Sequence, residues 1–283
     1  MQRLIINADD FGSNEEVTLE IERLIEEGLI SSTTIMANGQ CLDEVRKFTE
    51  LHPNISYGIH LCLSEFSSLT CSPILNKYGI TDSNGIFIKQ QIFQIKEFPT
   101  ELLDAIKAEL LAQIDKVRDL GISISHADSH HHVHTIYALR NVFKEVLDER
   151  NISKIRIGTD VKPLYMFKQL LKNRRKGTAL QNASQSSSKE STPMLFIRII
   201  NYIKLAFYRI SINRYYRKHF VTTDLFCSFS VFMDEYVKGR NKKVIEAMCH
   251  PGHPGASYKA EITLLEKSKL DKNNINIISY NEL

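Results

Sequence analysis

The sequence predicts an α/β fold in which strands and helices alternate around a parallel sheet, open or closed as a barrel. Short apolar runs typical of buried strands alternate along residues 4–157 with segments of helical periodicity. Such alternation implies parallel pairing with right-handed crossovers. Several of the runs end in Asp or His, and the active sites of such folds lie at strand ends. The 283 residues suit one elaborated domain, because α/β barrels run to ~250 residues.

The first strand is predicted at residues 4–6, where three apolar residues precede a polar segment. Ser13 or Asn14 suits the N-cap of the next helix, and Glu residues in its first turn face the positive end of the helix dipole. Apolar residues then recur at helical spacing, and Gly28 is a good stop signal.

The later elements follow from the same patterns of apolar spacing. Strands are predicted at residues 29–36, 56–61, 122–128 and 154–157, and helices at residues 42–49, 101–120 and 136–150. A last apolar run, near residues 243–249, delivers His250 before Pro and Gly turn the chain. We expect one domain over residues 1–283.

Two segments break this alternation, and together they suggest a basic, lid-like insertion at about residues 163–219. Residues 178–192 are rich in Ser, Gln, Asn and Lys and predict a mobile loop. Residues 194–219 are apolar but studded with Lys and Arg, which predicts a helix with a wide apolar face. That face either packs over the barrel as a lid or homodimer surface, or lies on a membrane surface.

The composition is that of an ordinary globular protein, with 43% apolar and 24% charged residues. The net charge of +3 is too small to imply nucleic-acid binding, and no recognition motif accompanies the basic residues. The five cysteines form no Cys-x-x-Cys pair, which argues against a disulfide framework or a thiolate zinc site. No run suits a signal peptide or membrane span, so we expect a cytoplasmic protein.

The most informative feature is the segment 126–134, which holds five of the ten histidines. It follows a strand-like stretch, and imidazole is the commonest metal ligand. The cluster therefore makes a metal-dependent hydrolase the first hypothesis.

Metal-assisted hydrolysis also needs a base for the attacking water and an acid for the leaving group. Asp9 and Asp10 follow the first strand, and a tight loop could direct one carboxylate to a metal and the other to a water. His60 and the histidine cluster could supply imidazoles, and His250 could donate a proton. Each feature also has a plain structural explanation: an Asp pair forms caps and turns, a buried His forms hydrogen bonds, and His-Pro-Gly forms turns.

Taken together, the segments resemble the YdjC-like carbohydrate deacetylases, the family of chitooligosaccharide deacetylase. The resemblance rests on Leu4-Ile-Ile-Asn-Ala-Asp-Asp-Phe-Gly12, Gly58-Ile-His-Leu61, Asp128-Ser-His-His-His-Val-His134 and Glu246-Ala-Met-Cys-His-Pro251, with shorter matches at residues 28–34 and 38–39. These segments occur in the family's order. The resemblance implies a distorted TIM-like (β/α) barrel of the glycoside hydrolase/deacetylase type. It also implies a divalent metal, most often Mg²⁺ and in some members Zn²⁺.

By position, the resemblance implies that Asp10, His60 and His130 bind the metal. Asp9 corresponds to the general base and His250 to the general acid. Other matching residues correspond to positions that orient ligands or contact substrate, and they are Asp128, His132, His134, Arg156 and Glu246. Arg156 could anchor a carboxylate or the substrate. The implied reaction removes an N-acetyl group from an amino sugar, and the implied partner is an N-acetylated sugar or oligosaccharide.

The chain departs from the family pattern after the His-Leu motif. Family members commonly carry Gly-x-Pro there, whereas residues 64–70 of this chain read Ser-Glu-Phe-Ser-Ser-Leu-Thr. The segment 163–219 is also longer and more basic than we expect. The substrate could therefore be a chito-oligosaccharide or a precursor sugar at a membrane. Two rival functions are a different metal-dependent hydrolase on the same barrel and a non-catalytic or membrane-associated metal-binding homologue.

Overall fold

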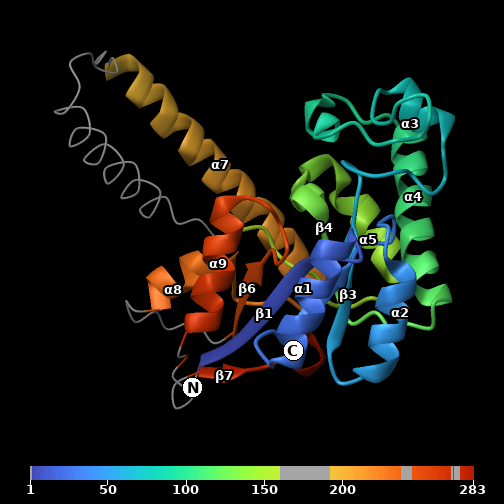
Figure 1. The fold of residues 1–283 in the computed structure, drawn as a ribbon. Helices are drawn as coiled ribbons and strands as arrows, with labels where there is room; N and C mark the ends of the chain where they lie inside the picture. The colour runs from blue at the N-terminus through green and yellow to red at the C-terminus, as the bar shows by residue number, and fades with distance from the viewer. Residues whose placement is uncertain (1, 160–191, 237–243, 269, 271–274) are drawn as a thin grey trace, which may run out of the picture.

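The computed structural model describes residues 2–159, 192–236, 244–268, 270 and 275–283. Its centre is a parallel sheet of seven strands in which six follow the order β4-β3-β2-β1-β6-β5. Strand β1 (Gln2–Phe11) runs through the middle of the molecule (Figure 1). It pairs with β2 (Ser32–Ile35) on one side and with β6 (Val244–Cys249) on the other. The predicted parallel α/β fold is confirmed.

The sheet curves toward a distorted barrel beyond its regular ladders. Strands β3 (Ser56–Leu61) and β4 (Ala127–Ser129) continue it on one side, and β5 (Leu225–Ser228) continues it on the other. Strand β7 (Ile275–Ile277) pairs with the start of β1. Isolated parallel bridges join Ala127 to Ile155 and Lys154 to Val221, and Val221 lies four residues before the start of β5. These bridges carry backbone pairing from β4 toward β5.

The predicted helices form with small shifts at their ends. They are α1 (Glu15–Glu26), α2 (Leu42–Leu51), α4 (Thr100–Asp119) and α5 (Arg140–Glu149), the last preceded by the short helices η2 (His130–Thr135) and η3 (Tyr137–Leu139). Asn14 caps α1, because its side-chain oxygen accepts a hydrogen bond from the amide of Val17 at 3.0 Å.

Three predicted strands are shorter than expected, and the first of them, β2, begins at Ser32 rather than at residue 29. The ladder of β4 begins at Ala127 rather than at residue 122, although Ser125 N already donates to Tyr57 O. The predicted strand at residues 154–157 makes only isolated bridges. Its amides alternate between partners, because Arg156 N donates to Ala127 O whereas Ile155 N donates to Val221 O. The segment thus spans two neighbours without a continuous ladder to either.

Residues 62–99, for which the sequence predicts no element, contain α3 (Pro73–Lys77) and η1 (Gln91–Gln94). Their first loop is anchored on Glu109 of α4, which is fully buried. Its carboxylate accepts hydrogen bonds from the amides of Leu69 and Thr70 at 3.0 and 2.9 Å. A buried carboxylate with this many donors fixes the loop beside the strand ends.

The predicted basic helix is α7 (Thr192–His219), which projects from the barrel (Figure 1). Its last turns pack inward, where Ile212 and Tyr216 are fully buried, whereas Phe207 and Ile210 are 69% and 57% exposed. Residues 160–191, and with them nearly all of the predicted mobile loop, lie outside the described residues. Among the described residues, no helix combines the length and apolar character that crossing a membrane requires. The remaining helices are α8 (Phe229–Tyr236), α9 (Ala256–Lys267) and η4 (Tyr280–Glu282).

Candidate active site

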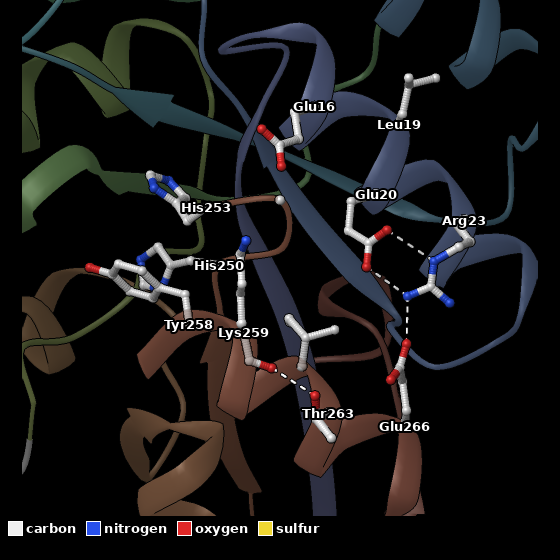
Figure 2. A pocket seen from close by; sticks show the side chains of 12 residues that line it. Glu16, Leu19, Glu20, Arg23, His250, His253, Tyr258, Lys259, Thr263 and Glu266 are labelled. Atoms are coloured by element: carbon white, nitrogen blue, oxygen red, sulfur yellow. Dashed lines mark hydrogen bonds and ion pairs between the residues drawn. The ribbon is translucent and has the colours of Figure 1, made fainter. Parts of the chain in front are cut away.

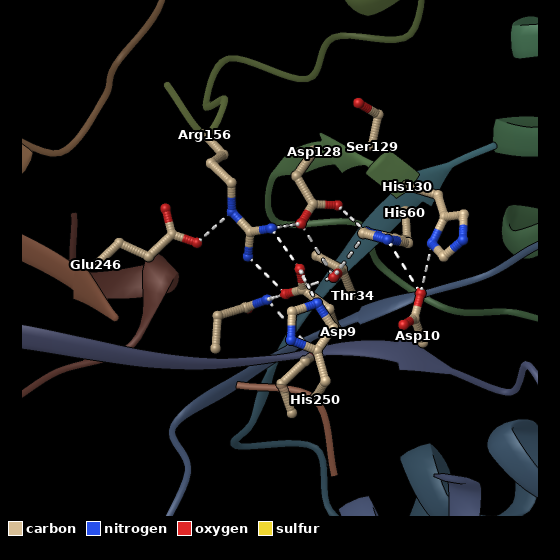
Figure 3. A network of polar contacts seen from close by, with 12 residues as sticks. Asp9, Asp10, Thr34, His60, Asp128, Ser129, His130, Arg156, Glu246 and His250 are labelled. Atoms are coloured by element: carbon tan, nitrogen blue, oxygen red, sulfur yellow. Dashed lines mark hydrogen bonds and ion pairs between the residues drawn. The ribbon is translucent and has the colours of Figure 1, made fainter. Parts of the chain in front are cut away.

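The structure brings the predicted metal ligands together at the carboxyl ends of β1, β3 and β4 (Figure 3). Asp10 is the next-to-last residue of β1, His60 lies near the end of β3, and His130 directly follows β4. The prediction that Asp9 and Asp10 follow the first strand in a tight loop is wrong, because β1 continues to Phe11 and includes both residues, with an irregularity in its pairing between Ala8 and Phe11. All three are buried. Asp10 has a left-handed backbone with φ of 73°, which is uncommon for a residue other than glycine and typical of functional sites.

Two imidazole nitrogens converge on one oxygen of Asp10. Asp10 Oδ1 lies 3.2 Å from His60 Nε2 and 2.9 Å from His130 Nδ1. The three ligand atoms lie within 4.8 Å of one another. Two nitrogens and a carboxylate oxygen are the donor set of many catalytic metal sites, which leave further positions open for water and substrate.

The hydrogen bonding of His60 supports a cation at this place. His60 Nδ1 lies 2.6 Å from Asp128 Oδ1, so the proton of a neutral ring belongs on Nδ1 and the lone pair on Nε2. That lone pair then faces an Asp10 oxygen, and two acceptors 3.2 Å apart need a cation between them. Without a metal, a proton fills this need. Although burial opposes it, the Asp128 and Asp10 carboxylates raise the pKa of His60 well above its usual value. The residues therefore fit a divalent metal.

Asp9 points away from Asp10 and into a buried ion-pair network. Arg156, which is fully buried, contacts both oxygens of Asp9 at 2.6 and 2.7 Å. Asn7 donates a further hydrogen bond to Asp9 at 2.9 Å. Burial alone would raise the pKa of Asp9, but the Arg156 charge and hydrogen bonds hold it well below its usual value. Asp9 is thus ionised and oriented.

Arg156 gathers three carboxylates in all. Besides Asp9, it contacts Asp128 Oδ2 at 2.5 Å and Glu246 Oε1 at 2.6 Å. These contacts are all with carboxylates of the chain itself, and a contact of Arg156 with the substrate stays a prediction. The hydroxyl of Tyr280 donates to Glu246 Oε2 at 2.5 Å. Burial raises the pKa of Glu246 to about 7, against the opposing charge of Arg156.

His250 lies on the open side of the site. Its Nε2 is 3.9 Å from Asp9 Oδ2, and its side chain is 19% exposed, against 2% for that of Asp9. His253, which the sequence analysis did not select, lies 3.0 Å from Asp10 Oδ2 through its Nε2. The sequence signal that could have pointed to His253 is the repeated His-Pro pair in residues 250–254. A cavity of about 580 Å³ between α1 and α9 opens beside both histidines, with Tyr258 against their rings (Figure 2).

A close backbone contact fixes the turn that carries these two histidines. Gly252 has φ of 74°, and a Cβ added there would lie 2.5 Å from Val17 Cα. Only glycine suits that contact and that backbone conformation. The turn after β6 is therefore packed directly on the first turn of α1, beside Asp9 and Asp10.

The other cluster histidines make different contacts. His126 stacks on Tyr280, with ring centroids 3.6 Å apart. His132 lies next to Phe226 and His134, and His134 Nδ1 contacts Ser129 Oγ at 2.5 Å. Burial is the main cause that lowers the pKa values of His132, to about 3, and of His134. Both rings are thus neutral at pH 7.

Glu65 is a second residue that the sequence analysis missed. Its Oε2 lies 3.4 Å from His130 Nε2, and its Oε1 lies 2.6 Å from Lys89 Nζ. Together with His130 and His131 it forms another group whose ligand atoms lie within 4.8 Å of one another. Glu65 lies in the loop where the sequence departs from the family pattern, so motif matching could not find it.

Comparison with known proteins places these motifs in one family. A family model described as YdjC-like protein matches residues 3–276. A carbohydrate deacetylase of Brevibacillus brevis is 34% identical over 152 residues, which cover 53% of this chain and 57% of that relative. A carbohydrate deacetylase of Clostridium beijerinckii is 32% identical over 150 residues, or 53% and 58% of the two chains. The matches therefore span less than two thirds of each relative.

A solved structure has a similar fold. The putative cellobiose-phosphate cleavage protein of Enterococcus faecalis V583 superposes with a TM-score of 0.65 at 22% sequence identity. The superposition covers 99% of this chain and 98% of that one. The predicted distorted (β/α) barrel is thereby confirmed.

Proposed function

Because the chain belongs to the YdjC-like family, we propose that it is a metal-dependent hydrolase that removes an N-acetyl group from an amino sugar and releases acetate. The observation that carries the proposal is the convergence of His60 Nε2 and His130 Nδ1 on Asp10, beside Asp9 and His250. The names of the curated relatives favour a carbohydrate substrate.

Asp10, His60 and His130 would hold the metal. When bound, such an ion polarises an amide carbonyl and lowers the pKa of a water molecule. Imidazole ligands suit zinc and related transition metals, whereas magnesium favours oxygen ligands. The donor set therefore favours a transition metal, and the magnesium suggested by the family resemblance stays a prediction.

Asp9 is the proposed base and His250 the proposed acid. Asp9 takes a proton from the attacking water, and the resulting oxygen nucleophile bonds to the acetyl carbon. Arg156 and Asn7 hold the Asp9 carboxylate in place for that transfer. As the carbon–nitrogen bond breaks, His250 gives its proton to the departing nitrogen, which leaves acetate and a free amino sugar. Asp128 keeps His60 oriented, and Glu246 supports Arg156.

The test is acetate release from a panel of N-acetylated sugars by metal-stripped and metal-restored protein. The panel contains chito-oligosaccharides and nucleotide- or lipid-linked N-acetylhexosamines. Metal-dependent release with multiple turnovers is expected. Metal binding without release from any sugar would instead favour a different hydrolase or a non-catalytic, metal-binding homologue.

The role of α7 stays open between two proposals, a surface for a homodimer and a peripheral membrane contact. Exposed Phe207 and Ile210 favour an apolar partner, and Arg209 and Arg214 on the same helix favour an anionic one. The cytoplasmic location also stays a prediction. The five free cysteines fit a reducing compartment.

A further inference from the structure

The two imidazoles of the proposed metal site are each flanked by a second carboxylate. His60 has Asp10 at Nε2 and Asp128 at Nδ1. His130 has Asp10 at Nδ1, and Glu65 Oε2 lies 3.4 Å from its Nε2, a buried nitrogen that makes no hydrogen bond with the described residues. In both rings, one nitrogen faces the common Asp10 oxygen and the other faces a carboxylate that belongs to a different segment. Nε2 of His60 and Nδ1 of His130 therefore face Asp10, whereas Nδ1 of His60 and Nε2 of His130 face the second carboxylate.

The backbone of Glu65 is held in place by contacts that do not involve its carboxylate. Its carbonyl oxygen accepts hydrogen bonds from Asn38 Nδ2 at 3.3 Å and from Cys62 Sγ at 3.2 Å. A few residues later, the loop is fixed on buried Glu109. Glu65 therefore faces His130 from a well-anchored loop.

His130 is also fixed from the other direction. His131 and His132 both have left-handed backbones, with φ of 52° and 58°, so the chain turns sharply after His130. The turn sends His131 to Ser64, where its Nδ1 lies 2.9 Å from the hydroxyl oxygen. Consecutive left-handed residues other than glycine are uncommon and persist where surrounding contacts enforce them.

We propose that Glu65 is a positioning residue for the metal, which acts by accepting a hydrogen bond from His130 Nε2. His130 then binds the ion through Nδ1, whereas His60 binds it through Nε2. A metal-ligating histidine commonly donates its other ring N–H to a carboxylate, and that contact fixes both the tautomer and the ring orientation. The inference rests on the proposed metal dependence.

A second ion between Glu65, His130 and His131 is the competing explanation of the same cluster. Lys89 argues against it, because its ammonium group lies 2.6 Å from Glu65 Oε1 and already supplies a cation there. A second ion would also need the Nε2 atom of a ring whose Nδ1 faces Asp10. The structure thus favours one ion and a supporting carboxylate.

The experiment measures Zn²⁺ affinity by competition with a chromophoric chelator, without any substrate. Glu65→Gln should weaken Zn²⁺ binding by about 10–100-fold, the range for loss of a supporting carboxylate, and Glu65→Asp should recover part of the loss. Glu101→Gln is the matched control. Glu101 is also paired with a lysine, Lys77 at 2.6 Å, but it lies on α4 outside the site, so its loss should leave the affinity unchanged.

Nitrogen-15 NMR of the Zn²⁺-loaded protein gives a second readout that a merely structural role would not move. We expect metal coordination at Nδ1 of His130 and at Nε2 of His60. Coordination of His130 through Nε2, two ions per chain, or equal affinities of Glu65→Gln and wild type would each overturn the inference. Absence of Zn²⁺ binding by the wild type would instead overturn the proposed function.

Discussion

The two walls of the candidate site differ in how tightly their side chains are held. On the β1–β3–β4 wall, Asp10 and His60 have side chains only 2% exposed, and each contacts more than one partner. On the β6–α9 wall, His250 and His253 are 19% and 30% exposed and border a cavity. The closed wall suits a fixed metal, whereas the open wall suits a proton donor that meets a substrate from solvent.

The strongest test of this difference removes a ligand from the closed wall. Asp10→Ala should abolish both metal binding and acetate release, because the oxygen on which both imidazoles converge is lost. Metal content by mass spectrometry and acetate release measure the two effects. Retained metal and activity in a folded variant would show that the closed wall is not the metal site.

A change on the open wall should separate turnover from metal binding. His250→Ala should lower turnover by about 10²–10⁴-fold, the usual contribution of a general acid, with metal affinity unchanged. Steady-state kinetics and Zn²⁺ titration of the same preparation are compared. Wild-type turnover, or a parallel loss of metal, would remove the proposed distinction between the walls.

Arg156 lies behind the closed wall, and its loss should appear as instability. Arg156→Met removes the counter-charge of buried Asp9 and one of the charged partners of Asp128, so it should lower the free energy of unfolding by about 3–5 kcal/mol at pH 7. Urea denaturation measures this. In contrast, Arg46→Met breaks only the exposed pair with Glu50 and should cost about 0–1 kcal/mol.

The sign of the pH dependence follows from the lowered pKa of Asp9. A carboxyl group with a lowered pKa in the folded state adds stability above its unfolded pKa of 3.8, and that stability is lost as pH falls through the folded value. In Arg156→Met, Asp9 loses the group that lowers its pKa. The difference in the free energy of unfolding between wild type and Arg156→Met should therefore become smaller at low pH.

Metal binding on the closed wall should release protons. The pKa of His60 is raised, against burial, by Asp128 and Asp10, and that of His130 is raised, again against burial, by Asp10 and Glu65. His60 thus holds a second ring proton in the metal-free protein near neutral pH, and the raised pKa of His130 favours its protonated form. The protonated rings stabilise the folded state of the metal-free protein. This contribution to the free energy of unfolding is complete below the unfolded pKa of 6.5 and is lost as pH rises through the raised folded pKa values. Calorimetry in buffers of different ionisation enthalpy should show proton release and weaker Zn²⁺ binding at lower pH.

The smallest effect is expected far from both walls, on α7. If α7 contacts a membrane, anionic vesicles should bind the protein at low salt, and Phe207→Ser with Ile210→Ser should weaken that binding while acetate release from a soluble sugar stays unchanged. Sedimentation with vesicles measures the first effect. A concentration-dependent dimer that the double variant disrupts, without vesicle binding, would favour the homodimer surface.

Local patterns predicted the framework of the molecule well. The strand ends that carry Asp9, His60 and His250 and the N-cap at Asn14 follow from apolar spacing and capping chemistry, which nearby residues decide. The family motifs selected Asp10, His60 and His130, and the structure brings these three together.

Contacts between distant segments could not be predicted in the same way. Tyr280 reaches Glu246 from 34 residues away, and Glu65 reaches His130 across more than 60 positions. Neither residue belongs to a local pattern that would reveal its partner. The same limit applies to the histidine cluster at residues 126–134. Its sequence does not reveal that the left-handed backbones of His131 and His132 direct neighbouring rings to different places.

The contact at Gly252 has a practical consequence for redesign. Because the turn of His250 and His253 rests directly on the Val17 backbone, that turn and the start of α1 behave as a single rigid part. Directed evolution of substrate preference should leave this part unchanged and place its diversity at the residues of α9 that line the cavity. There, the variation can reshape the approach to the histidines without shifting them.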